Sequence, residues 1–192
     1  MKDVLKLLLV LTLICFLAGL LLAMVNKVTE DPIRRAQRAE KMEAIRKVLP
    51  PCDNRPDEET VTVSDHNAQW TFYVARRGGQ YAGAAFEASS DKGYGGTIRV
   101  MVGVNADGTV NAIEILSHKE TPGLGARISE PAFKNRFAGR DIQDTTWAVR
   151  KDGGDIDEIT AATISSRAVV GAVADGLAVY QGHAATIEAG GN

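Results

Sequence analysis

The sequence predicts an α+β protein with one N-terminal transmembrane helix, a connector helix and a single globular domain. The chain of 192 residues opens on a long apolar run. Two hairpin patterns follow, in which apolar and polar residues alternate, and an apolar stripe at helical spacing closes the chain. These three observations divide the chain into residues 1–28, 29–51 and 52–192, and the last segment is expected to hold an antiparallel sheet with flanking helices.

The N-terminal apolar run is long enough to cross a lipid bilayer. Residues 7–25 are apolar apart from Thr12 and Gly19, and about 19 residues of α-helix span roughly 28 Å. A cleaved signal peptide is the alternative, but its core is usually shorter and ends at a small-residue site that this run lacks. We interpret the run as a retained single-pass anchor. Basic residues flank it on both sides, so charge leaves its orientation open.

A connector helix is predicted over residues 29–51. Thr29 is a good capping residue, and Pro32 suits the first turn of a helix. Apolar residues then recur near helical spacing until Pro50 and Pro51 end the element. The polar stretch 52–60 is expected to be a loop.

Two β-hairpins are predicted next. Residues 70–74 and 81–88 flank an Arg-Arg-Gly-Gly turn, and residues 98–104 and 110–116 flank an Asn-Ala-Asp-Gly turn. Between the hairpins lies Gly-Tyr-Gly-Gly at 93–96, whose glycines permit unusual backbone angles or close approach to a ligand.

The remaining elements are shorter, apart from the closing helix. We expect a short helix over 131–137, a last strand over 147–151 and a Lys-Asp-Gly-Gly turn. The closing helix has an apolar stripe formed by Val169, Val173, Leu177 and Tyr180.

Composition excludes several classes of function. The net charge of −2 gives no indication of a nucleic-acid partner. Cys15 lies in the apolar run and Cys52 in the predicted loop, so they are not expected to pair. The chain has no CxxC motif and no cluster of Cys and His, so we expect no metal site.

Two segments carry residues suited to ligand binding. The first is Glu-Thr-Pro-Gly-Leu-Gly, Glu120 to Gly125, where Pro122 and Gly123 suit a type II turn. Gly125 is expected to leave backbone exposed, so that a planar ring can lie against the loop and accept hydrogen bonds from main-chain N–H groups. The alternative is an ordinary turn between a strand and a helix.

The second segment runs into the closing helix and contains Thr160, Thr163, Ser165 and Ser166. Hydroxyl residues at a helix start often cap the first N–H groups. The same N-terminus binds anions, so a phosphate can be held there, and a hydroxyl there can carry it covalently. Spacing alone leaves both interpretations open.

The order of these motifs resembles the FMN-binding domain family to which the G subunit of the Rnf electron-transport complex belongs. That order is Gly-Tyr-Gly-Gly, a valine-rich hairpin, Glu-Thr-Pro-Gly-Leu-Gly, Lys-Asp-Gly-Gly-x-Ile-Asp and Thr-Ala-Ala-Thr-Ile-Ser-Ser. The related C subunit of the sodium-translocating NADH:quinone reductase shares the domain. The resemblance covers almost the whole chain.

This resemblance implies a cofactor site. The family signature has a Thr esterified to the phosphate of FMN, and that Thr corresponds to Thr163. Ala161 stands where the family has glycine, and if that position needs a positive φ, alanine costs on the order of 1 kcal/mol. The cofactor-binding residues implied are Thr163, Thr160, Ala161, Ala162, Ser165, Glu120, Thr121, Pro122, Gly123, Leu124, Gly125 and Tyr94.

The resemblance also implies a function. The chain would relay electrons through covalent FMN in a bacterial inner-membrane complex that passes electrons between ferredoxin and NAD, coupled to Na⁺ or H⁺ translocation. Its domain would lie on the periplasmic side. Its partners would be other membrane and peripheral subunits and a flavin transferase, and the chain alone would hold no complete active site.

Two alternatives remain open at this point. One is a membrane-tethered FMN-domain sensor or assembly factor without electron flux. The other is a hydrolase or transferase that uses Thr163 or Ser165 as nucleophile, for which the sequence offers no evident base.

Overall fold

The computed structural model describes residues 2–65 and 68–190, and the chain divides into two units, residues 1–40 and 41–192. Helix α1 spans Lys2–Val48, and its part up to residue 40 forms the first unit. This helix is long and apolar enough to cross a membrane, with a mean hydropathy of 2.9 and none of its most apolar window buried. The expected anchor is therefore consistent with the helix by length and composition.

The separate helix start predicted at Thr29 is wrong. Helix α1 continues through this position, and the Thr29 hydroxyl donates to the Val25 carbonyl at 2.8 Å instead of capping a new helix. Pro32 lies inside the helix, where it removes one backbone donor. Local capping signals were therefore overridden by helical residues on both sides. The point along α1 at which the anchor ends remains a prediction.

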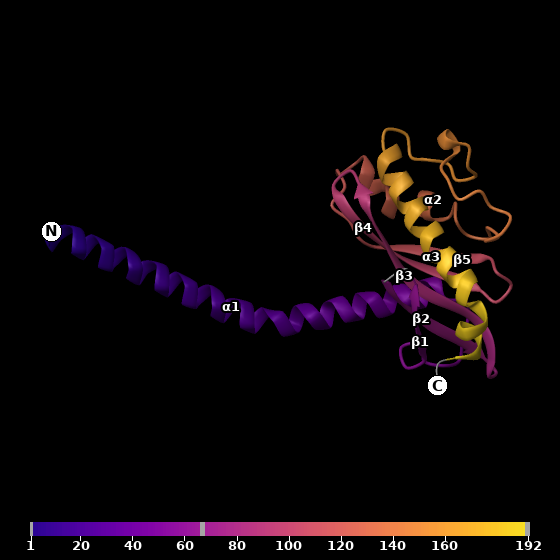
Figure 1. Cartoon of the computed structure of the whole chain (residues 1–192), viewed down its shortest axis with the longest axis horizontal. Coiled ribbons are helices and arrows are strands. Elements are labelled where there is room, and N and C mark those ends of the chain that lie inside the picture. Colours follow the sequence, from indigo (N-terminus) through magenta and orange to yellow (C-terminus); the bar gives the residue numbers. More distant parts are fainter. Residues whose placement is uncertain (1, 66–67, 191–192) are drawn as a thin grey trace. The chain divides into compact units, whose positions relative to one another are not determined.

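The second unit is built on a five-stranded antiparallel sheet in the order β1-β2-β3-β4-β5 (Figure 1). The strands are β1 (Thr60–Asp65), β2 (Ala68–Arg77), β3 (Gln80–Gly93), β4 (Gly96–Asn105) and β5 (Val110–Ser117). Both predicted hairpins are confirmed, as β2–β3 and β4–β5. The prediction missed β1, which pairs with β2 at the edge.

Helix α3 (Thr163–Ala189) covers one face of the sheet (Figure 1). The predicted stripe is confirmed, because Val169, Val173, Leu177 and Tyr180 are all buried. Phe86 of β3 lies at the centre of this core, with its ring centroid 5.3 Å from that of Phe72. A Cβ added at Gly176 of α3 would lie 2.2 Å from the Phe86 ring, so glycine lets the helix approach the sheet closely. This contact fixes the helix whose first residue is Thr163.

The opposite face of the sheet is covered by the last turns of α1. Ala44, Ile45 and Val48 pack there against Ala85 and Met101. The Asn111 amide donates to the Val48 carbonyl at 2.7 Å, which satisfies an acceptor at the helix end. The middle parts of β3 and β4 are therefore buried on both faces.

An ion cluster lies on this second face. Lys41 Nζ is 2.8 Å from Glu87 Oε2, and Arg99 Nε donates to Glu87 Oε1 at 2.6 Å. Burial raises the pKa of the Glu87 carboxyl, but the hydrogen bonds and charges of Lys41 and Arg99 outweigh it and hold the pKa below its usual 4.5. A carboxyl with a lowered pKa stabilises the fold above its unfolded-state pKa, and this contribution is lost as the pH falls through the lower folded-state pKa.

We therefore expect Glu87→Gln to flatten the acid side of the stability profile. The wild-type free energy of unfolding should fall as the pH is lowered below about 4.5, and the Glu87→Gln variant should lose part of that dependence. Denaturant unfolding at a series of pH values measures both. The matched control is Glu58→Gln, an exposed carboxylate paired with Arg55, which should keep the wild-type profile. Superimposable profiles for Glu87→Gln and wild type would contradict this expectation.

The segment between β5 and α3 holds short elements. These are η1 (Gly125–Ser129), α2 (Pro131–Lys134) and η2 (Arg150–Asp152). The short helix expected from Pro131 is confirmed in its first turn. The predicted last strand at 147–151 is wrong, because only Val149 forms an isolated bridge, to Ile156, before η2 begins. The Lys-Asp-Gly-Gly turn is confirmed, with Gly153 at φ 86°.

Candidate functional site

The site is built on the start of helix α3. Thr163 is the first helical residue and Ala162 occupies the N-cap position, without a side-chain capping bond. Ser166 is used locally: its hydroxyl accepts from the Ile159 N–H and donates to the Ala162 carbonyl, both at 3.0 Å. Within residues 2–65 and 68–190, no hydrogen-bond partner is found for the Thr163 hydroxyl. The capping interpretation therefore does not hold for Thr163.

The residue before the N-cap has an unusual backbone. Ala161 has φ 64°, and among the described residues it is the only one other than glycine with a positive φ. The left-handed region disfavours a Cβ, so alanine is strained here. The condition under which alanine was expected to cost energy at this position, a positive φ, is therefore met.

Replacing Ala161 by Gly should relieve that strain. We expect Ala161→Gly to raise the free energy of unfolding by about 0.5–1 kcal/mol, since the relief of roughly 1 kcal/mol is partly offset by the greater freedom of the unfolded chain. Ala162→Gly is the control, because Ala162 has φ −136° and gains nothing from glycine. Chemical denaturation of the three proteins measures the difference. Equal destabilisation by both substitutions would show that Ala161 is unstrained.

The Glu-Thr-Pro-Gly-Leu-Gly loop forms the opposite wall. The Leu124 N–H donates to the Thr121 carbonyl at 3.2 Å, and Gly123 has φ 74°, so the predicted Pro-Gly turn is confirmed. The expectation of exposed backbone at Gly125 is wrong. Gly125 is buried, and an added Cβ would lie 2.6 Å from Glu120 Oε2 and 2.7 Å from Ser165 Oγ. This glycine allows close packing within the protein.

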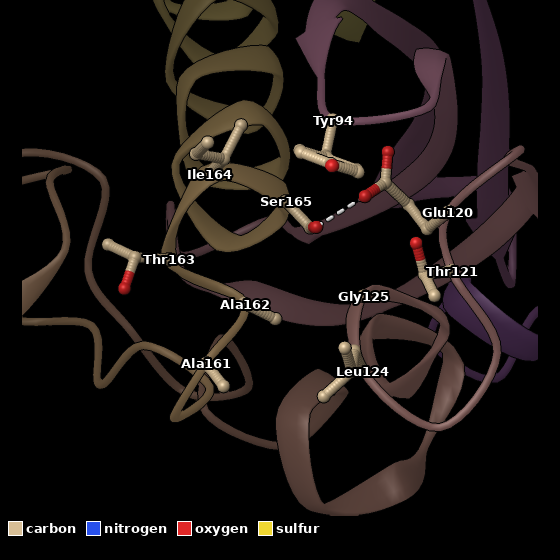
Figure 2. Close-up of a pocket in the computed structure, with 10 residues that line it drawn as sticks. All are labelled: Tyr94, Glu120, Thr121, Leu124, Gly125, Ala161, Ala162, Thr163, Ile164 and Ser165. Carbon is tan, nitrogen blue, oxygen red and sulfur yellow. Dashed lines mark hydrogen bonds between the residues drawn. The ribbon is translucent and has the colours of Figure 1, made fainter.

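Glu120 joins three segments of the site. Its side chain is only 5% exposed. Oε1 accepts the Gly95 N–H at 2.9 Å, and Oε2 accepts a hydrogen bond from the Ser165 hydroxyl (Figure 2). Its own N–H donates to His118 Nδ1 at 3.2 Å. The carboxylate therefore connects the Gly-Tyr-Gly-Gly turn, the loop and the first turn of α3.

The Gly-Tyr-Gly-Gly turn packs against this carboxylate. A Cβ on Gly95 would lie 1.9 Å from the Lys119 carbonyl oxygen, and one on Gly93 would lie 2.7 Å from Glu120 Oε1. Gly96 has φ 111°. The glycines thus permit both close approach and unusual backbone angles, but the approach is to the protein's own loop. Tyr94 between them is 72% exposed.

These segments enclose a cavity of about 550 Å³. It is lined by Tyr94, Glu120, Thr121, Leu124, Gly125, Ala161, Ala162, Thr163, Ile164 and Ser165 (Figure 2). Three residues expected in the site, Thr160, Pro122 and Gly123, do not line it. Ile164 lines it and was not predicted as a site residue. An apolar residue at the exposed start of an otherwise amphipathic helix was the signal for it.

The mouth of the cavity is apolar. Tyr94, Leu124 and Ile164 are 72%, 47% and 48% exposed, and among described residues beyond α1 they are the only large hydrophobic side chains left exposed. Figure 2 shows Glu120 and Thr163 on opposite sides of the start of α3. The cavity thus offers apolar contact surface, a free hydroxyl and the N–H groups of a helix start.

This combination of an apolar surface, a hydroxyl and helix N–H groups fits FMN. The cavity volume lies within the range usual for cofactor sites, which are mostly apolar with a few placed polar groups. The helix N-terminus suits a phosphate, and the apolar mouth suits a flat aromatic ring system. No group of three or more His, Cys, Asp or Glu that could hold a metal ion is found in the described part of the chain.

Comparisons with known proteins agree with this geometry. The protein-family model described as "FMN-binding domain" matches residues 93–178, a range that contains every residue lining the cavity. The G subunit of the ion-translocating oxidoreductase complex of Cereibacter sphaeroides is 39% identical, over 93% of this chain and 85% of that protein. The chain belongs to this family of G subunits. The protein of the same name from Aliivibrio fischeri is 36% identical, over 91% and 89% of the two chains.

Solved structures related to this family show the same fold. The C subunit of the Na⁺-translocating NADH-quinone reductase from Parabacteroides distasonis is similar with a TM-score of 0.50 and 29% identity, over 59% of this chain and 61% of that chain. Shewanella oneidensis NqrC gives a TM-score of 0.53 at 21% identity, over 69% and 70% of the two chains. The family assignment and the α+β fold inferred from the sequence motifs are both confirmed.

Proposed function

We propose that the chain is the electron-relay subunit of a membrane-bound ion-translocating oxidoreductase complex and carries FMN as a phosphoester on Thr163. The observation that carries this proposal is the Thr163 hydroxyl, which is the first hydroxyl of α3, has no partner among the described residues and lines an apolar-mouthed cavity. The complex is proposed to pass electrons between ferredoxin and NAD, with coupled Na⁺ or H⁺ movement.

The start of α3 supplies the environment for the phosphate. The N–H groups of the first helical turn have no carbonyl partner within the helix and carry about half a positive charge. A flavin transferase would form the ester from an activated flavin phosphate such as a flavin dinucleotide. The Thr163 oxygen would bond to the flavin phosphorus, the nucleotide monophosphate would leave from the same phosphorus, and the hydroxyl proton would pass to a base of the transferase.

The remaining lining residues would hold the ring system. Bound FMN supplies a group that accepts and releases electrons one at a time. Tyr94, Leu124 and Ile164 offer apolar contact at the mouth, and Glu120 keeps the two walls together. Electron relay needs no general acid or base from this chain. The covalent link would prevent loss of the cofactor from a domain facing the periplasm.

Helix α1 supplies the attachment to the membrane. Residues 7–25 carry no Asp, Glu, Lys or Arg, so this span has none of the charged groups that ion pathways use. Ion movement would therefore belong to other subunits, and the chain would contribute one redox centre on a membrane-anchored domain.

The proposed function is tested by redox titration of the full chain, co-expressed with a flavin transferase and purified in detergent. Flavin absorbance should bleach on reduction and return on oxidation. In the assembled complex, the electron donor should reduce the flavin at least as fast as the complex turns over. A complex whose turnover is the same with flavin-free and flavin-loaded chains would instead indicate a sensor or assembly factor.

A further inference from the structure

Glu120 is a buried carboxylate without a cationic partner. Both of its oxygens accept hydrogen bonds, from the Gly95 N–H and from the Ser165 hydroxyl. Within residues 2–65 and 68–190, no Lys, Arg or His side chain forms an ion pair with it. Each oxygen thus accepts one hydrogen bond, which is the role that a carboxylate can fill without a cation beside it.

Glu87 in the same domain differs from Glu120 in having cationic partners. Glu87 is also partly buried, but Lys41 and Arg99 neutralise its charge. Glu120 is more deeply buried, and no other Asp or Glu, nor any Lys, Arg or His, lines the cavity beside it. A buried charge that hydrogen bonds hold but no cation neutralises acts on its surroundings through a low dielectric. Because Glu120 lines the cavity, such a charge would act on a ligand bound there.

We propose that the negative charge of Glu120 lowers the reduction potential of the flavin, in addition to the role of its side chain in joining the walls of the site. This inference rests on the proposed function. In the proposed relay, the electron would come from a reduced donor protein and pass on to the acceptor, and Glu120 itself would be neither oxidised nor reduced. Reduction adds negative charge to the flavin, and a fixed negative charge at the cavity wall disfavours that step.

The substitution Glu120→Gln removes the charge and keeps the shape. The amide oxygen can accept the Gly95 N–H, and the amide nitrogen can donate to the Ser165 hydroxyl, which rotates to accept. We expect the midpoint potential of the full-length flavoprotein, followed by absorbance in a spectroelectrochemical cell, to rise. The expected change is tenfold or more in the equilibrium constant for one-electron reduction, or about 59 mV.

Two further variants separate charge from structure. Ser165→Ala keeps the charge and removes one of its donors, so its potential should lie at or below the wild-type value. Glu87→Gln removes a carboxylate on the opposite face of the sheet, outside the cavity lining, and should leave the potential unchanged. If Glu120 had only a structural role, the midpoint potentials of Glu120→Gln and Ser165→Ala would not shift differently.

Three outcomes would overturn the inference. They are an unchanged potential in flavin-loaded Glu120→Gln, an upward shift in Ser165→Ala, and a folded Glu120→Gln protein without flavin, which would assign the carboxylate to attachment. Failure of the proposed function has a different signature: the wild-type chain would carry no flavin, or turnover of the complex would be the same with flavin-free and flavin-loaded chains.

Discussion

Replacing Thr163 by Ala is expected to abolish covalent flavin. Wild-type protein co-expressed with a flavin transferase should give a band that fluoresces under ultraviolet light after denaturing electrophoresis, and the Thr163→Ala band should fall to background. The reason is that the other hydroxyls around the start of α3 are engaged or lie outside the cavity. Ser166 bonds Ile159 and Ala162, Ser165 bonds Glu120, and Thr160 does not line the cavity.

Thr160→Ala is the matched control for this experiment. It removes a hydroxyl three residues before Thr163 without altering the cavity lining, and it should retain full fluorescence. Loss of the fluorescence in Thr160→Ala together with its persistence in Thr163→Ala would assign the attachment site to Thr160. Circular dichroism of Thr163→Ala should match wild type, because its side chain makes no hydrogen bond in the described structure.

Replacing Phe86 by Ala is expected to cause the largest loss of stability. Phe86 is completely buried, and its ring is packed by Phe72, Trp70 and the backbone of α3 at Gly176. Removing a fully buried phenyl group leaves a cavity and typically costs about 3–5 kcal/mol. Denaturant unfolding of the detergent-solubilised chain, followed by tryptophan fluorescence, measures this loss.

The same substitution should also affect the flavin site. Phe86 holds α3 against the sheet, and Thr163, Ile164 and Ser165 begin that helix. Flavin incorporation should therefore fall in Phe86→Ala at temperatures where the domain begins to unfold. Phe86→Leu retains much of the volume and should lose clearly less stability. A loss below about 1 kcal/mol in Phe86→Ala would show that the site collapses around the substitution.

The sequence predicted those parts of the fold that follow from local periodicity. Alternation in β4 and β5, the Asn-Ala-Asp-Gly turn and the stripe on α3 each report burial of one face, and all are present. Strand β1 escaped prediction because only Val61 and Val63 turn inward in a short polar stretch. The segment at 147–151 has the composition of a strand, but a single bridge and a 3₁₀ turn replace it.

The candidate site could be predicted from the sequence where the type of a single residue indicates an unusual backbone angle or a reactive hydroxyl group. Thr163, the Pro-Gly turn and the positive φ at Ala161 belong to this class. The hydrogen bond between Glu120 and Ser165 joins residues 45 apart, so no local pattern reveals it. The apolar mouth likewise brings Tyr94, Leu124 and Ile164 together from three separate segments. Such features depend on tertiary packing, which single-sequence periodicity does not report.

Peptide mass spectrometry of the co-expressed full-length chain locates the flavin attachment residue. Trypsin cleaves after Lys151 and Arg167 and releases the peptide 152–167, which contains Thr160, Thr163, Ser165 and Ser166. We expect this peptide to carry the mass of one FMN less one water, and fragmentation to assign the added mass to Thr163. An FMN adduct on any other residue, or an unmodified peptide from protein that retains fluorescence after denaturation, would contradict this expectation.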